Sequence, residues 1–220
     1  MDAVRVNLGC GLQCPPGWIN VDNSMGVKLA KFPIARQLLT KVVPKKWDVL
    51  PNPQWAENVQ WMDITRRFIF EDNSVDYIYS SHLLEHLTWN EAKFTLSECL
   101  LVLKPGGVVR IIVPDLLTIV KGYLADRKTN PHLAAKNFLK NTLYFEIPVP
   151  RFFLGLIKFY FRRKNNHHFL YDYEGLKYLL ELTGFRGVSL MQYGESRIPG
   201  IKEIDIPDRF RGAICVEAIK

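Results

Sequence analysis

Short apolar runs separated by turns and by longer periodic segments set the pattern of this chain. Runs of four to eight residues rich in Val, Ile and Tyr are typical of strands, and longer stretches with apolar residues three to four apart are typical of helices. Because the two kinds of segment alternate, the sequence predicts an α/β fold. We expect strands at residues 4–8, 18–21, 59–62, 75–80, 108–113, 188–193 and 212–218.

Two of the expected helices have recognisable ends. Thr88 followed three residues later by Glu91 is a capping box, which predicts a helix over residues 89–103, and the Pro-Gly pair that follows would stop it. Asp172 is suited to cap a later helix, and Gly184 is suited to end it, because glycine adopts the left-handed conformation at low cost. The apolar stripes of both helices indicate that they pack against the sheet.

The first strand ends in two glycines, within Val-Arg-Val-Asn-Leu-Gly-Cys-Gly at residues 4–11. Glycine lets the backbone turn sharply and approach a ligand closely. The second strand ends at Asp22, whose carboxylate can accept both hydroxyls of a ribose. Together they favour a nucleotide-cofactor pocket. The dinucleotide fingerprint requires a third small residue where this chain has Cys14, so a nicotinamide or flavin cofactor is less favoured.

Six short motifs occur in a fixed order along the chain. They are Asn-Leu-Gly-Cys-Gly from Asn7, Val-Asp from Val21, Ser-Val-Asp-Tyr-Ile from Ser74, Leu-Glu-His-Leu from Leu84, Leu-Lys-Pro-Gly-Gly from Leu103 and Val-Pro-Asp from Val113. In this order they resemble class I S-adenosylmethionine-dependent methyltransferases. The closest resemblance is to the small bacterial and archaeal type 11 enzymes associated with polysaccharide or cell-envelope biosynthesis. This implies a Rossmann-like seven-stranded sheet in the order 3-2-1-4-5-7-6, with the last strand antiparallel and with helical insertions.

The resemblance also implies S-adenosyl-L-methionine as the cofactor. Backbone amides at Gly9 and Gly11 would face its methionine portion, and Asp22 would accept its ribose hydroxyls. Asp63 would accept from the adenine amino group, with Ile64 supplying backbone. The alternatives at these positions are an ordinary turn, a surface aspartate and a helix N-cap. The expected cofactor-binding set is Asn7, Gly9, Cys10, Gly11, Asp22, Asp63, Ile64, Ser81 and His82.

A hydroxyl acceptor would benefit from a catalytic base, which typically contributes about 100- to 10,000-fold. The candidates are His167, His82 and Asp115. We favour His167, because the related enzymes carry a histidine four residues before an aromatic-Asp pair. His82 lies at the mouth of the fourth strand and comes next, while His168 would be an exposed neighbour. Alternatively no base is used, because the sulfonium already activates the methyl group and positioning suffices.

Residues 82–86, His-Leu-Leu-Glu-His, also fit the H-x-x-E-H pattern of one class of zinc peptidases. Two histidines four apart on a helix share a face and could bind zinc. That pattern belongs inside a long helix, whereas here the first histidine follows a strand, so a peptidase is a remote alternative. Glu85 and His86 are expected to settle the turn into the next helix. The four cysteines are scattered rather than paired at ligand spacing, and we expect no metal.

Length and composition suit one domain. The chain has 220 residues, 48% of them apolar, and we expect a single methyltransferase domain over residues 1–220. It would carry a basic insertion at about 25–55 and a helical lid over the acceptor site at about 121–166. No apolar run is long enough for a signal segment or a membrane span, which favours a cytoplasmic protein.

The net charge of +7 is concentrated in two stretches without acidic residues, 28–46 and 151–164, where basic residues alternate with apolar ones. Each is interpreted either as an amphipathic helix that covers the sheet or as a surface that docks on an anionic phospholipid or lipid-pyrophosphate carrier. The second interpretation would place the protein peripherally at the inner membrane face. Nucleic acid is not expected as a partner, because no binding module is recognisable. The oligomeric state stays open.

The leading hypothesis is therefore O-methylation of a sugar or of a similar small or lipid-linked acceptor. The alternative from another class is a protein that holds S-adenosylmethionine or S-adenosylhomocysteine without turnover and acts through a partner or a membrane surface. A polar acceptor pocket that contains a base would favour the enzyme.

Overall fold

The computed structural model describes residues 2–24, 27, 58–142 and 166–220. Within them a seven-stranded sheet has the order β3-β2-β1-β4-β5-β7-β6. Strands β1 to β5 are parallel to one another, and β7 runs antiparallel to its neighbours β5 and β6. The predicted Rossmann-like methyltransferase fold is therefore confirmed. The strands are β1 (Arg5–Leu8), β2 (Ile19–Asp22), β3 (Val59–Trp61), β4 (Val75–Ser81), β5 (Leu103–Pro114), β6 (Arg186–Leu190) and β7 (Ala213–Ile219).

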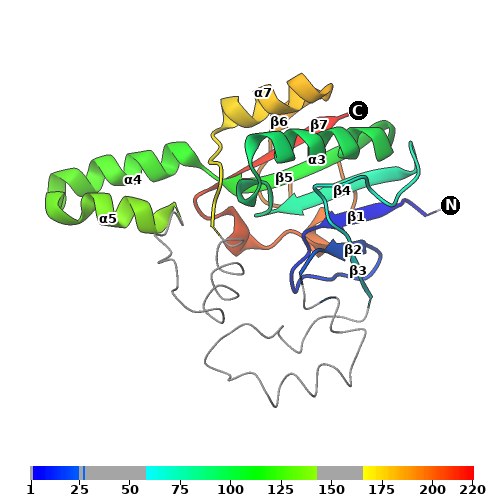
Figure 1. Cartoon of the computed structure of the whole chain (residues 1–220), viewed down its shortest axis with the longest axis horizontal. Helices are drawn as coiled ribbons and strands as arrows, with labels where there is room; N and C mark the ends of the chain where they lie inside the picture. The colour runs from blue at the N-terminus through cyan, green and yellow to red at the C-terminus, as the bar shows by residue number, and fades with distance from the viewer. Residues whose placement is uncertain (1, 25–26, 28–57, 143–165) are drawn as a thin grey trace, which may run out of the picture.

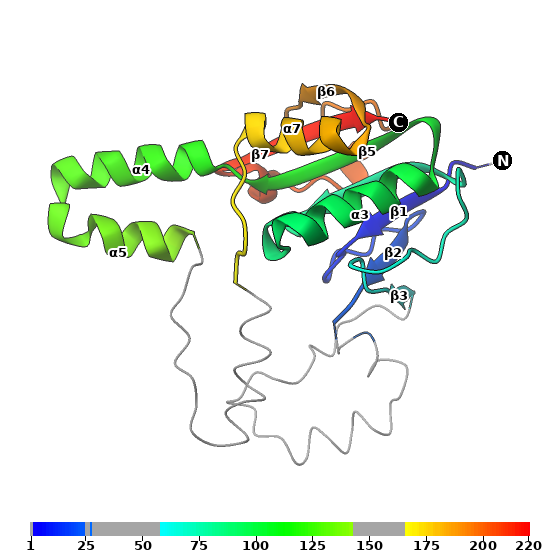
Figure 2. The same cartoon turned by 45° about the horizontal axis from the view of Figure 1, so that its top comes forward.

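Helices α3 and α7 lie side by side over one face of the sheet (Figures 1 and 2). Helices α4 and α5 form a hairpin that begins just after β5 and projects away from the sheet (Figure 2). Three short 3₁₀ turns complete the described elements. The bounds are α3 (Trp89–Val102), α4 (Leu116–Thr129), α5 (Pro131–Asn141), α7 (Tyr173–Thr183), η2 (Leu84–His86), η3 (Ile201–Glu203) and η4 (Pro207–Phe210).

The caps of α3 and α7 confirm the sequence prediction. The Thr88 and Glu91 side chains each accept from the other's backbone amide. The Asp172 carboxylate accepts from a first-turn amide of α7, and Gly184 ends that helix at φ 106°. The predicted end of the first helix at residue 103 is wrong. Leu103 already belongs to β5, because it pairs with Val75 of β4 before the Pro-Gly turn.

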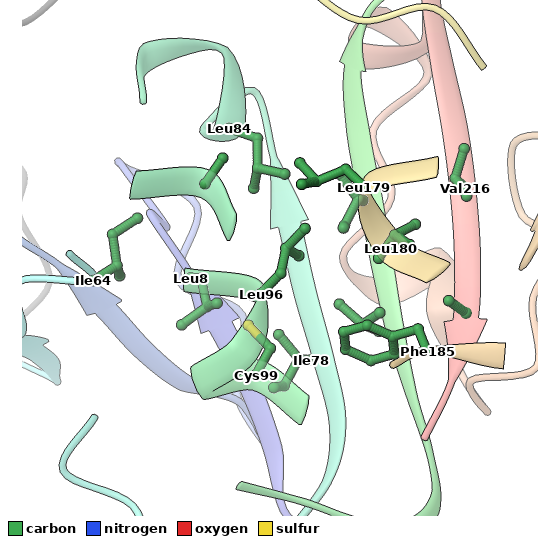
Figure 3. Packing of buried hydrophobic residues seen from close by; sticks show 14 of the residues in the cluster. Leu8, Ile64, Ile78, Leu84, Leu96, Cys99, Leu179, Leu180, Phe185 and Val216 are labelled. Atoms are coloured by element: carbon green, nitrogen blue, oxygen red, sulfur yellow. The ribbon is translucent and has the colours of Figure 1, made fainter. Parts of the chain in front are cut away.

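The main apolar core fills the layer between the sheet and helices α3 and α7 (Figure 3). Leu96 and Cys99 of α3 approach Leu8 and Ile78 of the sheet, while Leu179 and Leu180 of α7 lie toward β5 and β7. These side chains are at most 1% exposed. Burying each large one contributes roughly 1.5–3 kcal/mol, so this layer fixes where the strand ends lie.

The opposite face of the sheet carries a smaller core. Trp18, Tyr79 and Ile112 pack there with Ile198, Ile201 and Ile204 from the segment that joins β6 to β7.

The expected basic insertion at 25–55 and both basic stretches lie outside the described residues, apart from Val27. The described part of the segment expected to form a lid lies in α4 and α5, and its residues 143–165 also lie outside; that it covers the acceptor site stays a prediction. Among the described helices, none combines the length and the apolarity that crossing a membrane requires.

Candidate functional site

The carboxyl ends of the parallel strands meet at one edge of the sheet, which is where ligands bind in open α/β folds. Gly9 follows β1, Asp22 ends β2, His82 follows β4 and Asp115 follows β5. Strand pairing places these ends next to one another, because β1 contacts both β2 and β4, and β4 contacts β5. The structure thus gathers at one edge four positions that the sequence analysis singled out from separate parts of the chain.

The glycine turn after β1 needs the conformation that glycine provides. Gly9 has φ 63° and Gly11 has φ 54°. A side chain at Gly9 would also place its Cβ 2.7 Å from Leu83 Cδ1. The positive φ explains the glycine at both positions, and the close approach of Leu83 is a second reason at Gly9.

Asp22 is oriented by the turn that it faces. Its Oδ2 accepts from the Gly11 backbone amide at 3.0 Å, and its Oδ1 accepts from the Ser24 amide at 2.8 Å. A carboxylate has about four lone-pair sites, so these two bonds leave capacity for two further donors such as the hydroxyls of a ribose. The Gly11 amide, which was expected to face the methionine portion of the cofactor, is engaged by Asp22 instead.

Asn7 and Cys10 lie beneath the turn rather than at its surface. The Asn7 side-chain amide donates to the Gln13 carbonyl at 2.8 Å and to Asn20 Oδ1 at 2.9 Å, so both its N–H groups are used within the protein. Cys10 is buried, and burial raises the pKa of its thiol. Both side chains hold the shape of the turn.

Asp63 and Ile64 follow β3. Asp63 Oδ1 accepts from the Thr65 amide at 3.1 Å and from the Thr65 hydroxyl at 2.7 Å, while its Oδ2 lies 3.4 Å from Arg66 Nε. Ile64 is buried, and its carbonyl accepts from the Thr95 hydroxyl at 3.0 Å. Asp63 therefore caps a turn and not the helix that the alternative from sequence assumed, and its contact with adenine stays a prediction.

His82 adopts a strained backbone at the end of β4, with φ 53°. Such strain in a non-glycine residue persists only where the surroundings enforce it, and it is common at functional sites. Its amide donates to the Ile112 carbonyl at 2.8 Å, extending the β4–β5 ladder. Its ring Nε2 lies 2.9 Å from the Arg209 carbonyl and its Nδ1 lies 3.3 Å from Glu85 Oε1. The neighbouring Ser81 is buried, and its hydroxyl has no hydrogen-bond partner among the described residues.

His167 also lies beside Glu85, although it belongs to a segment about 80 residues further along the chain. The Glu85 carbonyl accepts from the His168 and Phe169 amides at 2.7 and 3.2 Å, which ties that segment to η2. His167 Nε2 then lies 3.9 Å from Glu85 Oε1, and the His167 ring meets the His86 ring edge-on at 5.0 Å. His168 is exposed, as predicted.

His167 and His82, which both lie beside Glu85, differ in the direction in which their pKa is shifted. Burial lowers the pKa of His167, and the nearby His86 and His82 lower it further against the opposing effect of Glu85. Burial also acts to lower the pKa of His82, but its contacts with Glu85 and with the Arg209 carbonyl outweigh that effect and raise it. His167 is therefore the histidine that favours the neutral, proton-accepting form.

Asp115 caps α4. Its Oδ1 accepts from the Leu117 amide, and its Oδ2 accepts from the Thr118 amide and hydroxyl. All three contacts are local, so the geometry favours a role in starting the helix over the predicted role as a base.

Glu85 is the residue whose importance the sequence reasoning missed. It was expected to settle a turn, but its side chain is 1% exposed and lies between His82 and His167. Its position beside a histidine in the motif was the available signal. The peptidase pattern, in contrast, does not form: His82 is not helical, and only residues 84–86 make a 3₁₀ turn.

Comparisons with known proteins agree with this geometry. Residues 7–111 match a family described as a methyltransferase domain. A curated protein of Mycolicibacterium smegmatis, named "Probable S-adenosylmethionine-dependent methyltransferase", is 42% identical over 60 residues. That match spans 27% of this chain and covers only about a fifth, 22%, of the relative's length.

Solved structures of similar shape include a SAM-dependent methyltransferase from Archaeoglobus fulgidus, with 18% identity and a TM-score of 0.48 over 99% of this chain and 86% of the other. One from Aquifex aeolicus has 13% identity and a TM-score of 0.44 over 99% and 82%. These values are too low to bear on function, and the sheet topology itself defines the fold. Residues 7–111 thus match a methyltransferase domain, and the sheet order of the described residues is that of Rossmann-like S-adenosylmethionine-dependent methyltransferase folds.

Proposed function

We propose that this chain transfers the methyl group of S-adenosylmethionine to a hydroxyl oxygen. The observation that carries the proposal is the Asp22 carboxylate at the end of β2, held toward the glycine turn by the Gly11 amide. A carboxylate so placed suits a ribose, and the match of residues 7–111 to a methyltransferase domain supports the same cofactor. The sulfonium already activates the methyl group, so the protein chiefly has to align donor and acceptor, which can contribute roughly 7–11 kcal/mol.

The proposed acceptor is a sugar or a similar small or lipid-linked molecule. The histidines beside Glu85 support a hydroxyl acceptor, because a neutral histidine can take the proton that the hydroxyl loses. The low proton affinity of buried His167 favours it as that base, with His82 as the second candidate. The same cluster argues against a protein that only holds the cofactor, and release of S-adenosylhomocysteine with crude acceptor pools separates the two.

A lipid-linked acceptor would bring the basic stretches at 28–46 and 151–164 to an anionic membrane surface. This docking is supported by charge alone, and flotation with anionic against neutral vesicles at low and high salt tests it.

Asp22→Ala is expected to weaken binding of S-adenosylhomocysteine at least tenfold, about 1.4 kcal/mol, because the ribose hydroxyls lose their acceptor. Calorimetric titration measures this directly. Asp72→Ala is the matched control, since Asp72 pairs with Arg67 on an exposed surface and should leave the affinity unchanged.

Loss of Asp22 also removes the acceptor of two backbone amides, so Asp22→Asn, which keeps an oxygen on the side chain, is tested beside it. Unchanged affinity in both folded Asp22 variants would remove this residue from the site.

A further inference from the structure

We propose that Glu85, His86 and His167 form a binding site for a divalent first-row transition-metal ion beside the carboxyl end of β4. Each of the three offers one ligand atom, and these atoms lie within 4.8 Å of one another. Atoms bound to one ion at about 2.0–2.2 Å can be at most about 4.4 Å apart, so closing the three onto an ion needs only small side-chain shifts. Two imidazoles and one carboxylate are a donor set that suits zinc, iron, cobalt or nickel.

The buried position of the Glu85 carboxylate favours a bound cation. Its side chain is 1% exposed, and among the described residues neither of its carboxylate oxygens accepts a hydrogen bond. Leaving an ionised carboxylate buried without a partner is strongly unfavourable. In the described part of the chain no lysine or arginine pairs with Glu85, whose ion-pair partners there are the rings of His82, at 3.3 Å, and of His167, at 3.9 Å. A metal ion would satisfy the carboxylate and leave the imidazoles neutral.

The hydrogen bond of His86 has the pattern of a metal ligand. A carbonyl can only accept, so His86 Nδ1, 3.2 Å from the Asn166 carbonyl, carries the proton and leaves Nε2 with its lone pair. By the same reasoning His82 Nε2 donates to the Arg209 carbonyl. Its Nδ1 lone pair then points at Glu85 Oε1, 3.3 Å away, which is repulsive unless a cation or a proton lies between them. Ligating histidines typically donate their other N–H to a backbone carbonyl in this way.

The site is placed to act in the reaction. His82 is 24% exposed and His86 is half-buried, so an ion could enter from the edge of the sheet where the strands end. An acceptor oxygen bound to the ion would lose its proton more easily. With that proton passed to solvent water, a lone pair of the acceptor oxygen would form the C–O bond to the methyl carbon while the C–S bond breaks and its electron pair stays on sulfur, releasing S-adenosylhomocysteine. This role rests on the proposed function, whereas metal binding itself does not. The proposal replaces the expectation from sequence that the chain holds no metal.

The test uses full-length protein treated with a chelator and then titrated calorimetrically with Zn²⁺. One ion per chain is expected, and Co²⁺ should give visible absorption bands that Zn²⁺ displaces. Glu85→Gln and His86→Asn should each weaken Zn²⁺ binding by about 100-fold or more. Replacing a residue that only hydrogen-bonds to a metal ligand already lowers metal affinity by roughly 10- to 100-fold, and these two variants remove a ligand itself. His132→Asn is the control, because this histidine is exposed on α5 and should leave binding unchanged.

The same samples are titrated with S-adenosylhomocysteine to separate this inference from the proposed function. Zn²⁺ binding that is absent in the wild type, or that survives in both variants, overturns the metal site; intact binding of S-adenosylhomocysteine then leaves the proposed function standing. A wild type that binds Zn²⁺ at this cluster but not S-adenosylhomocysteine supports the metal site and counts against the proposed function. Melting curves show that each variant is folded, and the Co²⁺ bands of the wild type test the site without any substitution.

Discussion

Replacing Arg110 by Met is expected to lower the free energy of unfolding by about 3–5 kcal/mol. Arg110, on β5, is fully buried and pairs with Asp205 at 2.7 Å and with Glu217 at 2.8 Å, both of them also fully buried. Its guanidinium donates in addition to the Gln192 and Glu195 carbonyls. Removing it takes the printed ion-pair partner from buried Asp205 and leaves Glu217 only the more distant Arg197, 3.9 Å away, and it frees the segment that covers the second face of the sheet. Urea denaturation measures the loss, and melting should fall on the order of 10 °C.

Arg211→Met is the matched control for Arg110→Met. Arg211 pairs with Asp208 at 3.0 Å, but its side chain is 83% exposed, and a solvated pair of this kind contributes less than about 1 kcal/mol. Equal losses in the two variants would mean that the buried cluster adds nothing to stability beyond an ordinary surface pair.

His167→Ala is expected to lower turnover by about 100-fold or more while leaving the affinity for S-adenosylhomocysteine nearly intact. The ring is 5% exposed, lies 3.9 Å from Glu85 and has a lowered pKa, all of which suit a group that acts on the acceptor rather than on the cofactor. Turnover is followed by release of S-adenosylhomocysteine, and affinity is measured by calorimetry. The loss is expected whether His167 takes the proton or holds the metal, and the Zn²⁺ titration separates these roles.

His168→Ala provides the control for His167→Ala, because it removes the same ring from the adjacent, exposed position and keeps the backbone amide that bonds to Glu85. Its turnover should match that of the wild type. If His167→Ala retains most activity and His82→Ala does not, the base lies at the mouth of β4 and the assignment to His167 is wrong.

Local signals explain why much of the fold could be predicted from the sequence. The capping pair Thr88 and Glu91 acts within one helical turn, and Gly184 ends α7 through its own backbone conformation. The strand order came from the resemblance of the motifs, and the glycine turn with Asp22 came from chemistry close to one strand end. All of these depend on residues near one another in the chain or on a shared order of motifs.

What could not be predicted depends on contacts between distant segments. Leu103 follows a good helical pattern, yet pairing with Val75 places it in β5. From the sequence alone, Arg110 would be expected to be an exposed strand residue. Its partners Asp205 and Glu217 lie about 100 positions away in the chain and meet it only in the folded protein. His167 comes close to the Glu85 side chain only because the His168 and Phe169 amides donate to the Glu85 carbonyl. No pattern in any of these segments alone indicates its partner.

Calorimetric titration of the wild-type chain with S-adenosylhomocysteine, and separately with NAD, tests the central claim most directly. The geometry of Asp22 and of the glycine turn predicts one S-adenosylhomocysteine site per chain and no tight binding of NAD. Tight binding of NAD, or the absence of any binding of S-adenosylhomocysteine by folded protein, would contradict it.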